Sequence, residues 1–199
     1  MKRYVYYFTI LLFFLPLHSC TEKKEINLPH LFKLPNFQLI NQDGEKYSST
    51  DLQGKVYFAS FVFTSCAMSC PKTLAALSSF QTRLSKLPQE LRMVTITVDP
   101  ETDTPERLKM KSVEFKADHS RWVFLTGSLK EIEDLVMNGY KLAMSKMINN
   151  LGDTIDVAHS DKFVLVDKNG WVRGLYGRES NEELDSLLEA MQFLLKEKN

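Results

Sequence analysis

The sequence predicts an α/β fold in which helices flank a mixed central β-sheet. Three observations support this: strands and helices alternate through most of the domain, two strands then follow one another directly, and the chain closes on a helix. Alternation predicts parallel strands joined by helices, whereas the short turn between the last two strands predicts an antiparallel pair. This order is that of the thioredoxin-like fold, here with an additional β-hairpin at the N-terminus.

The first 20 residues have the pattern of a secretory leader. Lys2 and Arg3 form its positive part, and an apolar stretch follows as far as Leu17. This stretch is short for a membrane-spanning helix, which needs roughly 20 apolar residues. It ends in a sequence that resembles the lipobox of bacterial lipoproteins, Leu17-His18-Ser19-Cys20, although histidine is unusual there. We expect a signal peptide over 1–19 and lipid attachment at Cys20; an ordinary signal peptide or an uncleaved anchor are the alternatives.

Length and composition indicate one globular domain, and the leader indicates that it is exported. Residues 20–34 are polar and contain proline, so we expect the lipidated N-terminus and a tether there, and a single domain over 35–199. Acidic and basic residues balance at 25 each, which argues against nucleic-acid binding. The predicted location is extracytoplasmic, on the periplasmic side, as a membrane-anchored lipoprotein.

The first predicted strands form a hairpin and a buried central strand. Segments 37–40 and 45–48 flank a turn that contains Asp43-Gly44, a pair that readily provides the positive φ of hairpin turns. The run from Lys55 to Phe63 is apolar on both alternating faces, which is typical of a strand covered on both sides. This run leads directly to Cys66.

The remaining elements alternate and then close the domain. Apolar residues at three- and four-residue spacing predict an amphipathic helix from Pro71 to Leu87. The elements predicted after it are a strand over Leu91–Val98, a helix over Thr104–Ala117, a strand over Arg121–Leu125, a helix over Ser128–Gly139, strands over Phe163–Val166 and Val172–Tyr176, and a helix over Asn181–Lys196.

Cys66 and Cys70 lie in the turn between the central strand and its helix. A helix N-terminus favours the thiolate form of cysteine. Three intervening residues place the two cysteines on the same side of one helical turn, where both can hold a single soft metal ion. A structural disulfide would close only a very small loop and would stabilise the fold little.

A copper ion held by two thiolates needs a further donor, for which imidazole is well suited. His30 falls in the tether and His119 in a polar loop, so we expect both to be ordinary exposed histidines. His159 precedes a predicted strand, and in a thioredoxin-like fold this loop passes beside the cysteine turn. By residue type alone, a histidine there is more often a structural residue than a ligand.

Four motifs in order resemble the Sco/SenC family of copper proteins, and the similarity runs from about Leu34 to Met191. They are Thr64-Ser65-Cys66-x-x-x-Cys70-Pro71, Val98-Asp99-Pro100-x-x-Asp103-Thr104-Pro105, Trp122-x-Phe124-Leu125-Thr126-Gly127, and His159-Ser160 ahead of a strand. The resemblance implies that Cys66, Cys70 and His159 bind one copper, as Cu(I) or Cu(II), and that the cysteines also cycle between dithiol and disulfide.

The resemblance also implies a partner and leaves the type of activity open. Family members help to build the dinuclear copper centre of cytochrome c oxidase, so the expected partner is the oxidase subunit that carries this centre, or another copper acceptor. A metallochaperone needs no substrate turnover. The main alternative is a thiol-disulfide oxidoreductase that reduces the acceptor's cysteines, with Cys66 and Cys70 as its catalytic redox pair. A thiol peroxidase ranks last.

Some residues near the motifs differ from the family pattern or invite another role. Many members have Asp where this chain has Ala158, which removes a potential partner for the histidine. Met68 offers a thioether, although methionine in such a loop is more often hydrophobic cover. Asp99 and Asp103 are interpreted as structural residues that end a strand and cap a helix.

Overall fold

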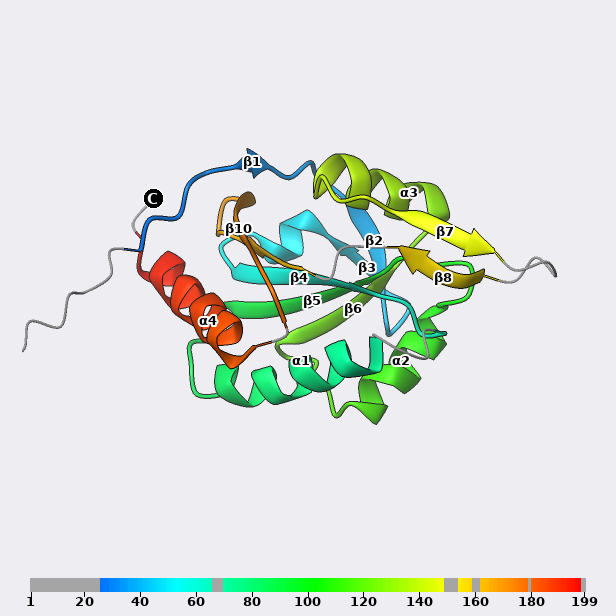
Figure 1. Ribbon diagram of the computed structural model, residues 1–199, viewed down its shortest axis with the longest axis horizontal. Coiled ribbons are helices and arrows are strands. Elements are labelled where there is room, and N and C mark those ends of the chain that lie inside the picture. Colours follow the sequence, from blue (N-terminus) through cyan, green and yellow to red (C-terminus); the bar gives the residue numbers. More distant parts are fainter. Residues whose placement is uncertain (1–25, 66–69, 149–153, 159–161, 179, 198–199) are drawn as a thin grey trace, which may run out of the picture.

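The computed structural model describes residues 26–65, 70–148, 154–158, 162–178 and 180–197. The main sheet has eight strands in the order β1-β10-β9-β4-β5-β6-β2-β3 (Figure 1). Strands β4, β5 and β6 are parallel, while β9 pairs antiparallel with β4 and β2 pairs antiparallel with β6. The strands are β1 (Phe32–Lys33), β2 (Gln38–Asn41), β3 (Lys46–Ser48), β4 (Val56–Val62), β5 (Leu91–Thr97), β6 (Trp122–Thr126), β9 (Phe163–Val166) and β10 (Trp171–Tyr176).

Helices cover both faces of this sheet. Figure 1 shows α1, α2 and α4 below the sheet and α3 above it. Their bounds are α1 (Cys70–Leu84), α2 (Pro105–Glu114), α3 (Leu129–Glu133) and α4 (Asn181–Lys196); a 3-10 turn, η1 (Ser49–Leu52), precedes β4, and a π-helix, η2 (Asp134–Gly139), continues α3. The prediction of a thioredoxin-like fold with a mixed sheet and an N-terminal hairpin is confirmed.

The central strand β4 is buried along its whole length, as its two apolar faces predict. On one face, the ring of Phe58 packs edge-on against Phe80 of α1, with centroids 5.3 Å apart. On the other face, Phe61 packs against Tyr140, with centroids 5.1 Å apart. Because helices on both sides hold this strand, its carboxyl end is a fixed point of the fold.

The two predicted hairpin turns are present. Strands β2 and β3 pair with Leu39 opposite Tyr47, and Gly44 in their turn has a φ of 79°. Gly170 has a φ of 81° in the turn between β9 and β10. Glycine adopts this left-handed conformation without steric cost, which is why both turns end in it.

The structure differs from the sequence prediction at several elements. A second, two-stranded sheet of β7 (Ser145–Ile148) and β8 (Thr154–Ala158) was not expected. The predicted helix over Ser128–Gly139 continues past Glu133 as the π-helix. Helix α2 ends at Glu114 rather than near Ala117, because Lys116 takes a left-handed φ of 52° that breaks the helix.

The end of the predicted tether is bound to the domain. Strand β1 pairs with the edge of β10, and the Leu31 N–H donates to the Val172 carbonyl at 2.9 Å. Among the residues that pack against the hydrophobic core is Leu28. The described fold therefore begins before residue 35.

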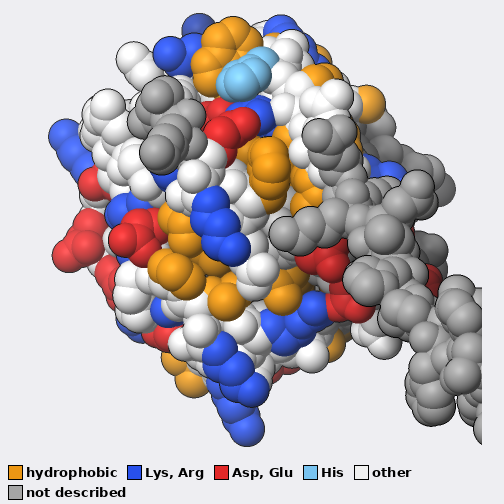
Figure 2. All heavy atoms as spheres, turned by 90° about the vertical axis from the view of Figure 1, so that its left-hand side faces the viewer, with side chains coloured by type: hydrophobic (Ala, Val, Ile, Leu, Met, Phe, Trp, Pro, Cys, Tyr) orange, Lys and Arg blue, Asp and Glu red, His pale blue; other side chains and the backbone are white. Residues whose placement is uncertain are grey.

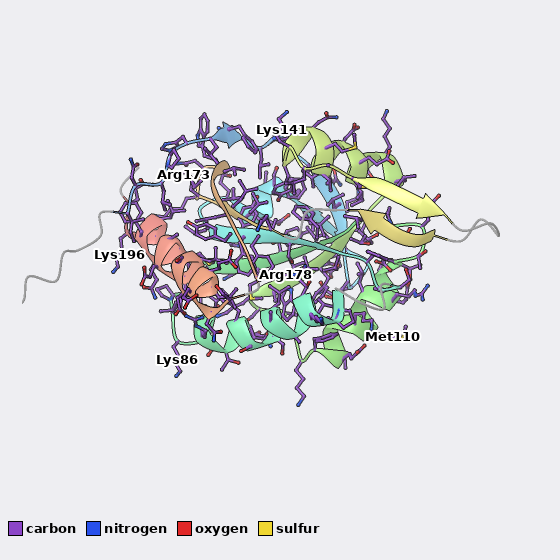
Figure 3. All side chains as sticks on the ribbon, viewed as in Figure 1. Lys86, Met110, Lys141, Arg173, Arg178 and Lys196 are labelled. Carbon is purple, nitrogen blue, oxygen red and sulfur yellow. The ribbon has the colours of Figure 1, made fainter. Side chains whose placement is uncertain are left out.

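Arg173 joins both ends of the described chain. Its side chain is 2% exposed, and its guanidinium donates to the Leu28 carbonyl at 2.6 and 3.1 Å, to Asp167 at 2.8 Å and to Glu197 at 2.7 and 3.0 Å. Figure 3 shows Arg173 and Lys196 at the left-hand end of the molecule. Figure 2 views this end directly, and acidic and basic side chains are intermingled on it.

Within the described part of the chain, no helix combines the length and the apolar character that a membrane span requires.

Candidate metal centre

Two segments that contain predicted copper ligands adjoin one edge of the sheet. Strand β4 ends at Val62, and its continuation carries Cys66; strand β9 begins at Phe163, shortly after His159. Because β9 is antiparallel to β4, the carboxyl end of β4 and the amino end of β9 lie at the same edge. This edge is on the right in Figure 1, opposite the end that Arg173 holds.

The chain that leaves β4 is held by Asp103. One carboxylate oxygen of Asp103 accepts from the Thr64 N–H at 2.9 Å, and the other accepts from the Thr64 hydroxyl. The Thr97 hydroxyl at the end of β5 also donates to Asp103, at 2.6 Å. Asp103 is fully buried and Thr64 is partly exposed, and their hydrogen bonds fix the backbone two residues before Cys66.

Asp103 itself is held by the turn after β5. Its N–H donates to the Asp99 carbonyl at 2.9 Å, and the Asp99 N–H donates to the Thr97 hydroxyl at 3.0 Å. Burial raises the pKa of Asp103 above its ordinary value, and hydrogen bonds from Thr64 and Thr97 oppose that rise. The turn therefore connects the ends of two parallel strands through one carboxylate.

The structural interpretation of Asp103 is confirmed, but the predicted role as the cap of the following helix was wrong. The residue that caps α2 is Thr104, whose hydroxyl accepts from the Arg107 N–H at 3.4 Å. Asp103 instead points to Thr64, which is 39 positions away. No local sequence pattern indicates a contact between residues that are so far apart in the sequence.

Helix α1 begins at Cys70, with Pro71 next to it. Proline suits the first turn of a helix because the N–H that it lacks would have no partner within the helix. The first turn of α1 contains no acidic residue, and Lys72 adds a positive charge there. Position 70 therefore lies at the positive end of the helix dipole, as predicted.

Arg178 reaches the same end of α1 from another element. It follows β10, and its guanidinium donates to the Thr73 hydroxyl at 2.6 Å (Figure 3). Thr73 is 2% exposed, and Arg178 is half-buried. No sequence motif indicates this contact, because Arg178 and Thr73 are 105 positions apart.

His159 comes directly after β8, which ends at Ala158. Strands β7 and β8 form an antiparallel pair whose last partners are Ser145 and Ala158. The position before the predicted ligand is thus set by a two-stranded sheet rather than by an isolated loop.

Cys20, Cys66, Met68 and His159 lie outside the described residues.

His30 and His119, which were predicted to be ordinary exposed histidines, have partners close by in the structure. His30 packs edge-on against Trp171, with ring centroids 5.4 Å apart, and its Nε2 lies 3.8 Å from Asp167. His119 Nε2 lies 2.8 Å from the Ser112 hydroxyl. Across the described ranges, no three His, Cys, Asp or Glu residues gather as a metal site.

The comparison with known proteins agrees with this architecture. The family model described as SCO1/SenC matches residues 29–194. A SCO1/SenC family lipoprotein from Bacillus anthracis is 33% identical, with a TM-score of 0.75, over 83% of this chain and 96% of its own.

Two further solved structures carry functional descriptions. BsSco, described as having a disulfide switch and as a member of the Sco family of cytochrome c oxidase assembly proteins, is 30% identical with a TM-score of 0.70, over 84% of this chain and 95% of its own. Yeast Sco1 with copper bound is 26% identical with a TM-score of 0.68, over 84% and 96%. The chain described here belongs to the SCO1/SenC family.

Proposed function

We propose that this chain is an extracytoplasmic copper metallochaperone that assists assembly of the dinuclear copper centre of cytochrome c oxidase. Copper is its cargo, and Cys66, Cys70 and His159 are the residues that would hold it. Two thiolates and one imidazole are a donor set that accepts both Cu(I) and Cu(II). A relative in the same family binds copper, and another is described as an assembly protein of the oxidase.

The observation that carries the proposal is the bracing of the sheet edge where the ligand-bearing segments attach. Asp103 fixes Thr64 just before the first cysteine, and α1 starts at the second cysteine. A braced edge lowers the cost of ordering the ligands when copper binds. The protein needs no bond-making step of its own: it holds Cu(I) and transfers it when acceptor ligands replace its own.

The proposal is tested by anaerobic Cu(I) titration of the reduced chain from Thr21 onward, which retains every described residue. The wild type should bind one copper tightly, and Cu(II) should give a thiolate charge-transfer band. His159→Ala should weaken both, whereas His119→Ala, which changes an exposed histidine of a distant loop, should change neither. Copper binding that is equal in His159→Ala and wild type would remove His159 from the site.

A second function rests on the same cysteines: reduction of a disulfide in the copper acceptor. One thiolate attacks the acceptor disulfide, a mixed disulfide forms, and the second cysteine releases the reduced acceptor while Cys66 and Cys70 become a disulfide. The disulfide switch named for BsSco favours keeping this alternative. A reductase should retain its thiol exchange rate in His159→Ala, whereas a chaperone should lose copper affinity.

We also propose that the protein is a lipoprotein attached through Cys20, on the periplasmic side of a membrane. The support is the leader and lipobox pattern together with the lipoprotein description of the Bacillus anthracis relative. An uncleaved anchor would export the domain equally well.

A further inference from the structure

We infer that Arg178 stabilises the copper-loaded state electrostatically. Its positive charge balances an anionic copper-dithiolate centre at the start of α1. This inference rests on the proposed function. It concerns a residue outside the three ligands and outside the motifs that identify the family.

The geometry places Arg178 at the correct end of the fold. Strand β10 pairs antiparallel with β9, which pairs antiparallel with β4, so β10 and β4 run in the same direction. Arg178 therefore leaves β10 at the edge where β4 continues toward Cys66. Its hydrogen bond to Thr73 confirms this placement.

Thr73 connects Arg178 to the second cysteine position. Residues three apart on a helix lie on the same face, with Cβ atoms about 5–6 Å apart. Thr73 is three residues after Cys70 in α1, so the guanidinium is held about one helical turn from that position. Because Thr73 is buried and Arg178 is half-buried, solvent screens this charge less than it would a fully exposed one.

The net charge of the proposed copper centre explains why a cation would be needed beside it. Cu(I) bound by two thiolates and one neutral imidazole carries one net negative charge, and taking an unbalanced charge out of water is unfavourable. Lys72 is exposed in the first turn, whereas Arg178 is fixed by a hydrogen bond. None of the ion pairs between described residues involves Arg178.

The test compares Cu(I) dissociation constants, measured by competition with a chromophoric Cu(I) chelator, at low and high salt. Arg178→Gln should weaken Cu(I) binding by about tenfold at low salt. Arg178→Lys should stay within about threefold of wild type, because it keeps the charge. The difference between Arg178→Gln and wild type should shrink at high salt, where charges are screened.

Two further variants separate charge from structure. Lys86→Gln removes an exposed charge beyond the other end of α1 and should leave the affinity unchanged (Figure 3). Thr73→Val removes the acceptor but keeps the charge, so it should weaken binding less than Arg178→Gln does. Thermal unfolding of each apo-protein shows whether the fold is intact.

The inference is overturned if Arg178→Gln binds Cu(I) as tightly as wild type, if Arg178→Lys is as weak as Arg178→Gln, or if the loss is independent of salt. A loss that is matched by a lower unfolding temperature would assign Arg178 a purely structural role. Failure of the wild type to bind Cu(I) would instead contradict the proposed function itself.

Discussion

The carboxylate of Asp103 accepts hydrogen bonds from both the N–H and the hydroxyl of Thr64, and so holds the backbone immediately before the cysteine turn. The pair joins the end of β4 to the turn after β5. Neither residue is a predicted copper ligand, yet together they fix the point from which the first ligand segment leaves the sheet.

Asp103→Ala should lower the free energy of unfolding by about 2–4 kcal/mol, because it leaves the donors of Thr64 and Thr97 without their acceptor in a buried place. Urea denaturation measures this value. Thr64→Val is the matched control: it keeps the backbone N–H bond and should cost only about 1 kcal/mol. Equal midpoints for Asp103→Ala and wild type would show that the network contributes nothing to stability.

Arg173→Leu should destabilise the domain by about 3–5 kcal/mol, because it removes the guanidinium that pairs with the buried carboxylate of Asp167. The loss should begin at the N-terminal segment, since Arg173 also holds the Leu28 carbonyl. Hydrogen exchange should therefore accelerate at the Leu31 N–H more than in β4. Lys196→Gln, an exposed change nearby, is the control; uniform exchange across the domain would argue against a local role for Arg173.

Glu197 should make stability depend on pH in the acid range. Its hydrogen bond with Arg173 holds the pKa of Glu197 below its ordinary value of 4.5. Since the folded state binds this proton less readily than the unfolded state does, the stabilisation is fully present above 4.5 and is lost as pH falls through the lowered pKa. Unfolding temperatures of wild type and Glu197→Gln should differ at neutral pH and converge at lower pH; a constant difference would contradict this origin.

Cys20→Ser should release the protein from membranes without changing copper affinity, because it removes the predicted lipid site and nothing in the described core. Fractionation followed by Cu(I) titration of both forms measures the two properties. Persistent membrane association would favour an uncleaved N-terminal helix as the anchor.

Elements with a clear local pattern were predicted closely, and contacts between distant residues were not. The apolar run of β4 and the periodicity of α4 gave their positions within a residue or two, because burial on one or both faces determines these patterns. The β7–β8 pair was missed, since Ser145–Ile148 lacks alternation. Its signals were the turn-forming residues between the strands and the short alternation over Thr154–Ala158.

The predicted ligand residues came from motif resemblance, whereas the structure around them depends on chain topology. Nothing near Asp103 in the sequence indicates Thr64, and nothing near Arg178 indicates Thr73. Both contacts exist because the order of strands in the sheet brings together segments that are far apart in the chain.

The hydrogen bonds from Arg173 to the Leu28 carbonyl fix the end of the domain at which the N-terminal segment enters. This end would face a membrane to which the N-terminus is anchored. If lipid is carried by Cys20, the residues between it and Leu28 span at most about 28 Å when fully extended. The described chain enters the domain at the end opposite the start of α1, where the predicted ligand Cys70 lies (Figure 1). An acceptor would then meet the predicted ligands at the end of the domain that faces away from the membrane. The segment between Cys20 and Leu28 would limit how far this end lies from the membrane.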